Sequence, residues 1–193
     1  NLITLAGGNV SVRMPNGDII ITASGMNYED MTTDDFIVFD KDKNIIEGTR
    51  RTSVDTPALF HIYDNMPNVN AILHTHQPYA TAVGLISDEL PACLTTLANT
   101  TLGAVNVAPY APPGNLSMGE LTVDYIGERL AVILKHHGVI AVGEDLHQAL
   151  YAAVYLEISA QTYLAAAAVK EPALLTKEQN DECAEIFKRV GQK

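Results

Sequence analysis

The sequence predicts an α/β protein, and two observations support this. Short apolar or alternating runs bounded by turn residues, which are typical of β-strands, recur along the chain. Segments with apolar residues at helical spacing lie between and after them, the longest being the Ala-rich residues 146–169. With 193 residues, of which 47% are hydrophobic, the chain can form one domain with a sizeable core. We expect that domain to span residues 1–193, and because the first residue is Asn1 rather than Met, we expect an amino-terminal segment before it.

Composition and charge exclude several classes of protein. The formal net charge is -11 and the 12 basic residues form no block, so the chain has no footprint for nucleic acid. No apolar run approaches the ~20 residues of a membrane span, and no signal-peptide pattern opens the chain, so we expect a cytoplasmic protein without a membrane partner. Cys93 and Cys183 form no metal pair or redox motif. We expect ordinary thiols, although a disulfide between them stays open.

The predicted strands and helices follow one another without repeats or linkers. The pair Asn16 and Gly17 predicts a type I′ hairpin turn between the first two strands. Strands are predicted at residues 9–13, 18–22, 36–39, 71–76, 105–108, 131–135 and 139–142. Helices are predicted at residues 57–65, 78–83, 117–130, 146–169 and 176–190, with at most a short helix at 28–35. Ser117 and Glu120 form a capping-box pattern, S-x-x-E, at the start of the third of these helices. The longest helix carries an apolar stripe that predicts a core or interface face, formed by Leu150, Val154, Ile158 and Leu164.

Two loops are rich in groups that bind anions. Residues 5–13, LAGGNVSVR, place Gly7, Gly8 and Asn9 directly before an alternating strand pattern. Glycines let the backbone approach a ligand or take positive φ, and asparagine offers an amide. Residues 22–25, TASG, end the next strand with hydroxyl groups and a glycine. In each case a plain turn is the alternative interpretation.

Histidines at two strand ends predict a metal site. Residues 70–76, NAILHTH, place His74 and His76 two positions apart, so that on an extended strand both imidazoles point to one face. Zinc prefers three or four such ligands. A third candidate follows the strand at 131–135, where His136 and His137 would point to opposite faces, and position alone does not select one. The alternative is that these are polar side chains at a strand mouth.

The segment RRTSVDTP, residues 50–57, predicts the start of a helix. Thr56 is the expected N-cap and Pro57 suits the first helical position. Asp55 and Ser53 lie just before the positive end of this helix, where each can act as a capping group. The functional alternative is that the helix terminus holds a phosphate, while Asp55 reaches a metal ion or a proton.

Five segments taken together resemble the class II aldolase and adducin family. They are GGNVSVR, ITASGMNYEDM, TSVDTP, AILHTHQPYATAVG and LKHHGVIAVGEDLHQALYAAVYLE, in this order and across essentially the whole chain. That family contains zinc-dependent L-fuculose-1-phosphate and L-rhamnulose-1-phosphate aldolases and L-ribulose-5-phosphate 4-epimerase. The resemblance implies a three-layer α/β fold with a central, mostly antiparallel sheet flanked by helices. It also implies a single class II aldolase/adducin-like domain and a homotetramer with active sites at subunit interfaces.

The resemblance assigns roles to individual positions. His74, His76 and His137 match the ligands of one Zn²⁺ per subunit. Asp55, nineteen residues before His74, matches the acidic residue that is a metal ligand in the free enzyme and an acid or base once substrate is bound. The positions that bind the substrate phosphate match Gly8, Asn9, Ser24, Gly25, Ser53 and Val54.

Five positions depart from the family pattern, and one of them, Val190, stands where the aldolase has a carboxy-terminal tyrosine. Val54 stands where a phosphate-binding serine is usual, and Ala6 replaces a threonine beside the phosphate of the aldolase. Thr95 stands where the aldolase has a catalytic tyrosine, and Asn99 stands where the epimerase has a catalytic aspartate. The sequence therefore matches neither mechanism completely, and the absent epimerase aspartate favours the aldolase.

The function that these residues predict is a zinc-dependent lyase acting on a phosphorylated sugar. We expect it to cleave a ketose 1-phosphate, L-fuculose 1-phosphate first among them, into dihydroxyacetone phosphate and L-lactaldehyde, as in fucose catabolism. Breaking such a bond leaves negative charge on the ketone fragment, and a Lewis acid stabilises that charge. The first alternative is an L-ribulose-5-phosphate 4-epimerase, which the sequence DTP at residues 55–57 favours. The second is a non-catalytic, adducin-like binding module.

Overall fold

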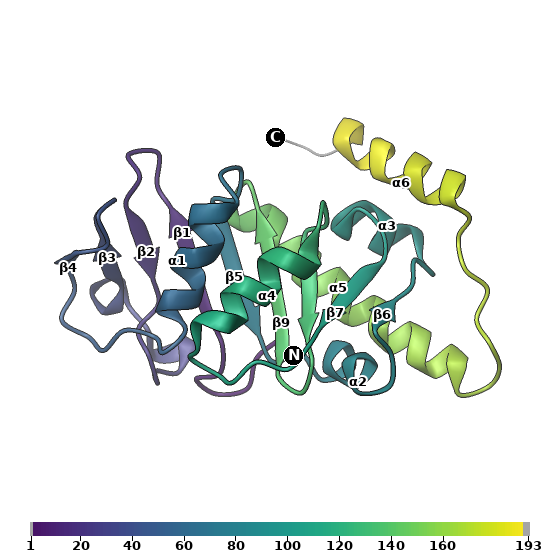
Figure 1. Cartoon of the computed structure of the whole chain (residues 1–193), viewed down its shortest axis with the longest axis horizontal. Helices are drawn as coiled ribbons and strands as arrows, with labels where there is room; N and C mark the ends of the chain where they lie inside the picture. Colours follow the sequence, from purple (N-terminus) through teal and green to yellow (C-terminus); the bar gives the residue numbers. More distant parts are fainter. Residues whose placement is uncertain (1, 191–193) are drawn as a thin grey trace.

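The structure is a computed structural model that describes residues 2–190, with side chains up to residue 186. Within these residues the chain forms a nine-stranded sheet in the order β4-β3-β2-β1-β5-β9-β8-β7-β6 (Figure 1). Neighbouring strands are antiparallel except β7 and β8, which are parallel, so the predicted mostly antiparallel sheet is confirmed. The strands are β1 (Asn9–Arg13), β2 (Ile19–Ile21), β3 (Ile37–Phe39), β4 (Ile45–Glu47), β5 (Ala71–Thr75), β6 (Glu89–Leu90), β7 (Val105–Ala108), β8 (Ala131–Leu134) and β9 (Gly138–Gly143).

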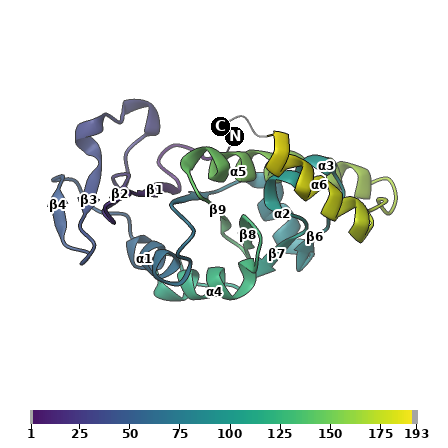
Figure 2. The ribbon, with the colours of Figure 1, turned by 90° about the horizontal axis from the view of Figure 1, so that it is seen from above.

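Helices cover both faces of the sheet, which confirms the three-layer α/β fold. Seen from above, α1 and α4 lie on one side, and α2, α3 and α5 lie on the other, with α6 packed outside α3 (Figure 2). No helix within residues 2–190 combines the length and hydropathy that crossing a bilayer requires. The helices are α1 (Thr56–Asn65), α2 (Pro78–Ile86), α3 (Thr95–Thr101), α4 (Leu116–Ile126), α5 (Leu146–Ala167) and α6 (Lys177–Val190), with 3₁₀ turns η1 (Tyr28–Asp30) and η2 (Thr33–Asp35).

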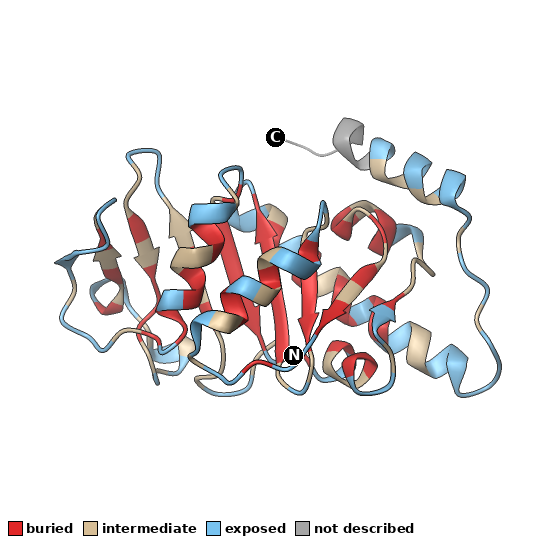
Figure 3. Ribbon diagram, in the orientation of Figure 1, coloured by how far each residue is buried: buried red, intermediate tan, exposed pale blue. Residues whose placement is uncertain are grey.

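The central strands are buried on both faces. Successive side chains of a strand point to opposite faces, so β5 sends Ala71 and Leu73 into the core under α2 and α5, and Ile72 into the core under α1 and α4. Every residue of β5, β8 and β9 is buried, and these strands form the red centre of Figure 3. Burial on both faces explains why their sequences are continuous apolar runs. The alternation also places His74 on the face of the sheet that α1 and α4 cover.

The first hairpin turn differs from the prediction. Gly17 N–H donates to Met14 O, so the central residues of the turn are Pro15 and Asn16. A type I′ turn requires positive φ at both central residues, but Asn16 is not among the residues with positive φ, whereas Gly17 has φ +93°. Proline at the first central position and a left-handed glycine after the turn suit a longer hairpin loop.

Two helices differ from their predictions. The capping box expected from Ser117 and Glu120 is wrong, because α4 is capped by Asn115, whose Oδ1 accepts a hydrogen bond from Ser117 N–H at 3.0 Å. Helix α3 was not predicted, because its Thr-rich sequence has low helix propensity and is held by packing against α5 and α6.

The buried face of α5 is also not the predicted one. Leu150 and Ile158 are 40% and 46% exposed, so they do not belong to the core, and the interface alternative remains for them. The buried face consists mainly of small residues, which allow the helix to approach β5 and β9 closely: Ala149, Ala152, Ala153, Leu156 and Ala160.

Arg13 joins the end of β1 to the segment between α1 and β5. Its guanidinium donates to the carbonyl oxygens of Tyr63 at 3.0 Å and Pro67 at 2.7 Å, and also to those of Met66 and Val69. Hydrogen bonds to a charged group contribute more than neutral ones, and here they satisfy carbonyls at the end of a helix, where the macrodipole favours a cation.

We predict that Arg13→Lys lowers the free energy of unfolding by about 2 kcal/mol, because the ammonium group of lysine cannot donate to all four carbonyl oxygens at once. Urea denaturation of the metal-free protein measures this. The control is Arg51→Lys, a change at an exposed side chain, which we expect to be nearly neutral. Equal losses in the two variants would contradict this role of Arg13.

Candidate functional site

Three segments far apart in the sequence meet at one edge of the sheet. In the β1–β5 ladder Asn9 pairs with His74, and in the β5–β9 ladder Thr75 pairs with Val139. The start of β1, the end of β5 and the turn before β9 therefore lie side by side. That turn joins β8 to β9 and carries His137.

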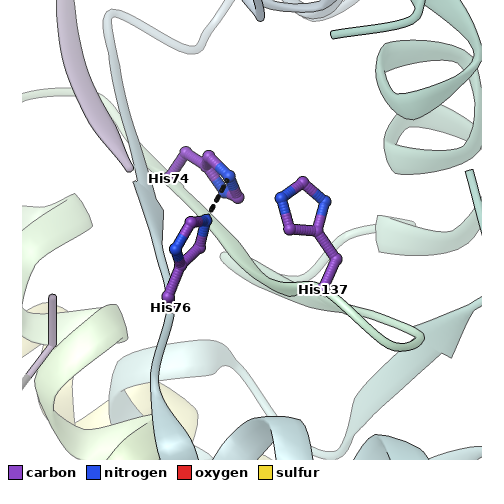
Figure 4. Close-up of side chains that lie close together, drawn as sticks. All are labelled: His74, His76 and His137. Carbon is purple, nitrogen blue, oxygen red and sulfur yellow. Dashed lines mark hydrogen bonds between the residues drawn. The ribbon is translucent and has the colours of Figure 1, made fainter. Parts of the chain in front are cut away.

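The imidazoles of His74, His76 and His137 face a common space (Figure 4). One ligating nitrogen from each ring lies within 4.8 Å of the other two, and His74 Nε2 and His76 Nε2 are 3.2 Å apart. His74 Nδ1 is 3.0 Å from Val139 O, and donation to this carbonyl leaves the Nε2 lone pair free for a metal ion. Ligands of tetrahedral zinc lie about 3.3 Å apart, given Zn–N distances of about 2.0–2.1 Å. The histidine group therefore fits a divalent cation.

The chemical state of these histidines suits ligation. Burial lowers the pKa of His74 to about 4, with the nearby Asp55 carboxylate opposing the shift. Burial also lowers the pKa of His137, and His76 adds to that shift. Both rings are therefore neutral at pH 7, the form that binds metals. His137 Nδ1 is buried without a hydrogen-bond partner in the described part of the chain, as a nitrogen reserved for a ligand would be.

His136 and His137 point in different directions, but not for the predicted reason. Residues 136 and 137 lie in a turn rather than on an extended strand. His136 has φ +62° and is exposed, and its ring lies 6.5 Å from that of Tyr110. His137 is turned inward, 4.7 Å from the ring of His74 between centroids.

The carboxylate of Asp55 is held beside the histidines on both of its oxygens. Oδ2 accepts a hydrogen bond from Asn9 Nδ2 at 2.9 Å, and Oδ1 accepts one from Gly114 N–H at 3.1 Å. Oδ2 lies 3.9 Å from His74 Nε2. The residue is 7% exposed. Asp55 thus lies beside the histidine group, where its carboxylate could help to hold a cation.

The start of α1 is arranged differently from the prediction. Asp55 occupies the N-cap position, but its side chain makes no capping bond, and Thr56 is the first helical residue. The Thr56 hydroxyl donates to Ser53 O at 2.8 Å, and Ser53 Oγ accepts from Asp55 N–H at 3.2 Å. Thr56 as N-cap is therefore wrong, and the carboxylate is free to face the histidines.

A cleft of about 190 Å³ opens beside this group. Five of the six predicted phosphate-binding positions line it, and so do Asp55 and two of the histidines: Gly8, Ser24, Gly25, Ser53, Val54, Asp55, His76 and His137. Asn9 is different, because it is 2% exposed and its amide donates to Asp55 and to Ser53 Oγ. Its role as a direct phosphate ligand stays a prediction.

Sequence reasoning missed one contributor to the site, and the two departures from the family's catalytic residues lie elsewhere in this chain. The loop between β7 and α4 reaches the cleft through Pro113 and Gly114, and the rigid run PYAPPGN was its only signal. Thr95 and Asn99 lie on α3, which covers the opposite face of the sheet. Within one chain they do not line the cleft.

Gly8 allows a close approach of two backbone segments at the site. It has φ +76°, and a Cβ added there would meet His74 O at 2.2 Å. No side chain fits at that distance, so β1 and β5 would have to separate.

We predict that Gly8→Ala lowers the free energy of unfolding by about 3 kcal/mol, from left-handed strain plus overpacking. The control is Gly17→Ala at φ +93°, where the nearest atom to a Cβ is 3.7 Å away, and strain alone should cost about 1 kcal/mol. Chemical denaturation compares the two. A similar loss in both variants would show that the close approach to His74 does not matter.

Comparison with known proteins places this chain in a family. The family described as Class II Aldolase and Adducin N-terminal domain matches residues 1–164. A 5-deoxy-D-ribulose 1-phosphate aldolase of Bacillus thuringiensis serovar kurstaki is 30% identical, over 96% of this chain and 87% of that protein. An L-fuculose phosphate aldolase of Escherichia coli strain K12 is 33% identical, over 95% and 85%. The solved structure of an L-fuculose 1-phosphate aldolase superimposes with a TM-score of 0.92 at 30% identity, covering 97% of this chain and 89% of that one.

Fold and site together define a metal-dependent enzyme built on a three-layer α/β scaffold. The chain belongs to the class II aldolase and adducin family. It is a metal-dependent lyase of the class II aldolase type, and the histidine group is where a metal ion could be held.

Proposed function

We propose that the protein is a zinc-dependent aldolase that cleaves a ketose 1-phosphate into dihydroxyacetone phosphate and an aldehyde. The observation that carries this proposal is the convergence of His74, His76 and His137 with Asp55 on one side of a donor-rich cleft. The named aldolases that the chain resembles over almost its full length support it further.

The residues of the cleft divide the proposed work between a cation site and an anion site. The three imidazoles would hold Zn²⁺, which would supply Lewis-acid stabilisation of the negative charge that develops when the C3–C4 bond breaks. On the other side, Gly8, Ser24, Gly25, Ser53 and Val54 would hold the phosphate. No lysine or arginine lines this cleft among the described residues, so phosphate binding would rest on backbone N–H groups and hydroxyls.

Asp55 is the residue proposed to move a proton. Its carboxylate lies 3.9 Å from His74 Nε2 and lines the same cleft as the proposed phosphate site. Hydrogen bonds from Asn9 and Gly114 fix the direction of its two oxygens. A carboxylate so placed can also ligate the cation before substrate arrives, and accept or return a proton at the substrate hydroxyl afterwards.

The substrate class follows from chemistry shared by the named relatives. L-Fuculose 1-phosphate and 5-deoxy-D-ribulose 1-phosphate are both ketose 1-phosphates with a methyl group at the far end, and both would yield dihydroxyacetone phosphate. The aldehyde is the part that differs. We propose L-fuculose 1-phosphate, which yields L-lactaldehyde, as the first substrate to test, and the corresponding place in fucose catabolism.

We predict that the zinc-loaded protein releases dihydroxyacetone phosphate from L-fuculose 1-phosphate, and that a chelator abolishes the release. An NADH-coupled assay of dihydroxyacetone phosphate measures this, with 5-deoxy-D-ribulose 1-phosphate run in parallel. If the zinc-loaded protein released none from any ketose 1-phosphate, the aldolase proposal would be wrong.

The second candidate is 4-epimerisation of a pentulose 5-phosphate. An aspartate rather than a glutamate at position 55 favours it, while Asn99, which lies away from the cleft, does not. Conversion of L-ribulose 5-phosphate to D-xylulose 5-phosphate without net cleavage would identify it. A non-catalytic module is disfavoured, because a scaffold has no need of the intact histidine group.

The two adjacent histidines offer a matched test of the third ligand. We predict that His137→Asn weakens zinc binding by more than about a hundredfold, since changes outside the ligand set already cost about 10- to 100-fold. His136→Asn should leave zinc affinity unchanged, because His136 is exposed and asparagine tolerates its positive φ. Titration against a chromophoric chelator measures both constants. Equal losses would remove His137 from the proposed ligand set.

We also propose how the protein assembles and where it is located. Apolar side chains exposed on α5, namely Leu146, Leu150 and Ile158, support self-association. The family resemblance supplies the number, a homotetramer. Cys93 and Cys183 are both free thiols, which supports a reducing compartment, and we propose the cytoplasm.

A further inference from the structure

The carboxylate of Glu157 is an unusual group on the buried face of α5. That face otherwise consists largely of alanines and Leu156, packed against β5 and β9. Glu157 is 8% exposed, and none of the ion pairs among the described residues includes it. A buried carboxylate is costly unless hydrogen bonds replace its lost hydration. An apolar residue would fill the position without that cost.

Its partners are two backbone N–H groups in the first turn of α2. Oε1 accepts from Tyr79 N–H at 3.0 Å, and Oε2 accepts from Ala80 N–H at 2.9 Å. The N-cap residue of α2 is Gln77, whose side chain makes no capping bond and instead donates to Ala153 O at 2.8 Å. Thus α5 supplies the cap that α2 lacks locally, with a negative charge that the helix dipole favours.

This cap fixes the chain directly after His76. Only Gln77 separates His76 from Pro78, the first residue of α2. On the other side, the β5 ladder ends at Thr75, and His76 N–H donates to Leu2 O at 3.0 Å. The hydrogen bonds that this segment donates to α5 therefore begin at Gln77, the residue that follows His76. In Figure 2, α5 and α2 lie on the same side of the sheet, opposite α1 and α4.

We propose that Glu157 is a positioning residue for the metal site, acting through the first turn of α2 on the direction of His76. This inference rests on the proposed function, because it takes His76 to be a zinc ligand. The carboxylate of Glu157 accepts hydrogen bonds from Tyr79 and Ala80, and neither of these residues lines the cleft. Its contribution is therefore to the geometry of the segment that carries His76. Groups that orient ligands are worth about 10- to 100-fold in metal affinity.

The test uses two substitutions that keep the volume of the side chain. Glu157→Met removes both acceptors, and Glu157→Gln keeps one acceptor in an isosteric group. We expect the zinc Kd, measured by chelator competition, to rise about tenfold in Glu157→Met and less in Glu157→Gln. Saturating zinc should restore kcat in both variants. Amide hydrogen exchange of the metal-free proteins should be faster at Tyr79 and Ala80, which reports loss of the cap without reference to activity.

The control removes a similar cap, the one at the start of α5. Asp145 Oδ1 accepts from Gln148 N–H at 2.8 Å and caps α5, with no link to His76. Asp145→Ala should lower thermal stability and leave the zinc Kd unchanged. If Glu157→Met also lowers stability alone, with zinc affinity intact, Glu157 is only structural and the inference is wrong. If the unmodified protein binds no zinc, the proposed function fails in that first titration and the inference falls with it.

Discussion

The register of β5 between its two neighbours is the constraint on which the site depends. A shift of one residue would turn His74 from the face of α1 and α4 into the apolar core under α2 and α5. Glycines enforce the register at the edge of the sheet. A Cβ at Gly8 would meet His74 O at 2.2 Å, and a Cβ at Gly138 would meet Thr75 O at 2.2 Å. Backbone geometry therefore places His74 and the turn that carries His137.

Charge at the site is balanced without basic side chains. The chain carries a formal net charge of -11, and no lysine or arginine lines the cleft among the described residues. The Asp55 carboxylate is held by an amide and a backbone N–H, and the proposed phosphate site consists of similar neutral donors. A bound cation would then be the main positive charge near the reacting carbons.

Sequence patterns predicted the parts of this fold that depend on local periodicity. Apolar runs located the central strands, and a spacing of two placed His74 and His76 on one side. The patterns failed where the outcome depends on distant partners. The donors to Asp55 come from Asn9 and Gly114, 46 and 59 positions away, so its local capping motif suggested a role that it does not have.

Two further failures have the same origin in local information. The core alternative for the stripe on α5 fails at Leu150 and Ile158, because hydropathy favours leucine over alanine, whereas close packing on β5 and β9 favours alanine. The strand pattern puts His136 and His137 on opposite faces of an extended strand, and it does not tell which of them faces the site. A turn with left-handed His136 decides between them, and φ at a non-glycine residue is not evident from sequence.

The three histidines are held by unequal means, and this has a consequence for how the site responds to change. His74 lies within a ladder paired on both sides, and His137 lies in the tight turn between β8 and β9. His76 lies beyond the ladder, and its position depends on the docking of α2 against α5. The sheet can therefore stay intact while His76 loosens. If the histidines hold a metal ion as proposed, its affinity would be sensitive to a helix contact on the opposite face of the sheet, because α5 packs on β5, which carries His74, and caps α2, which follows His76.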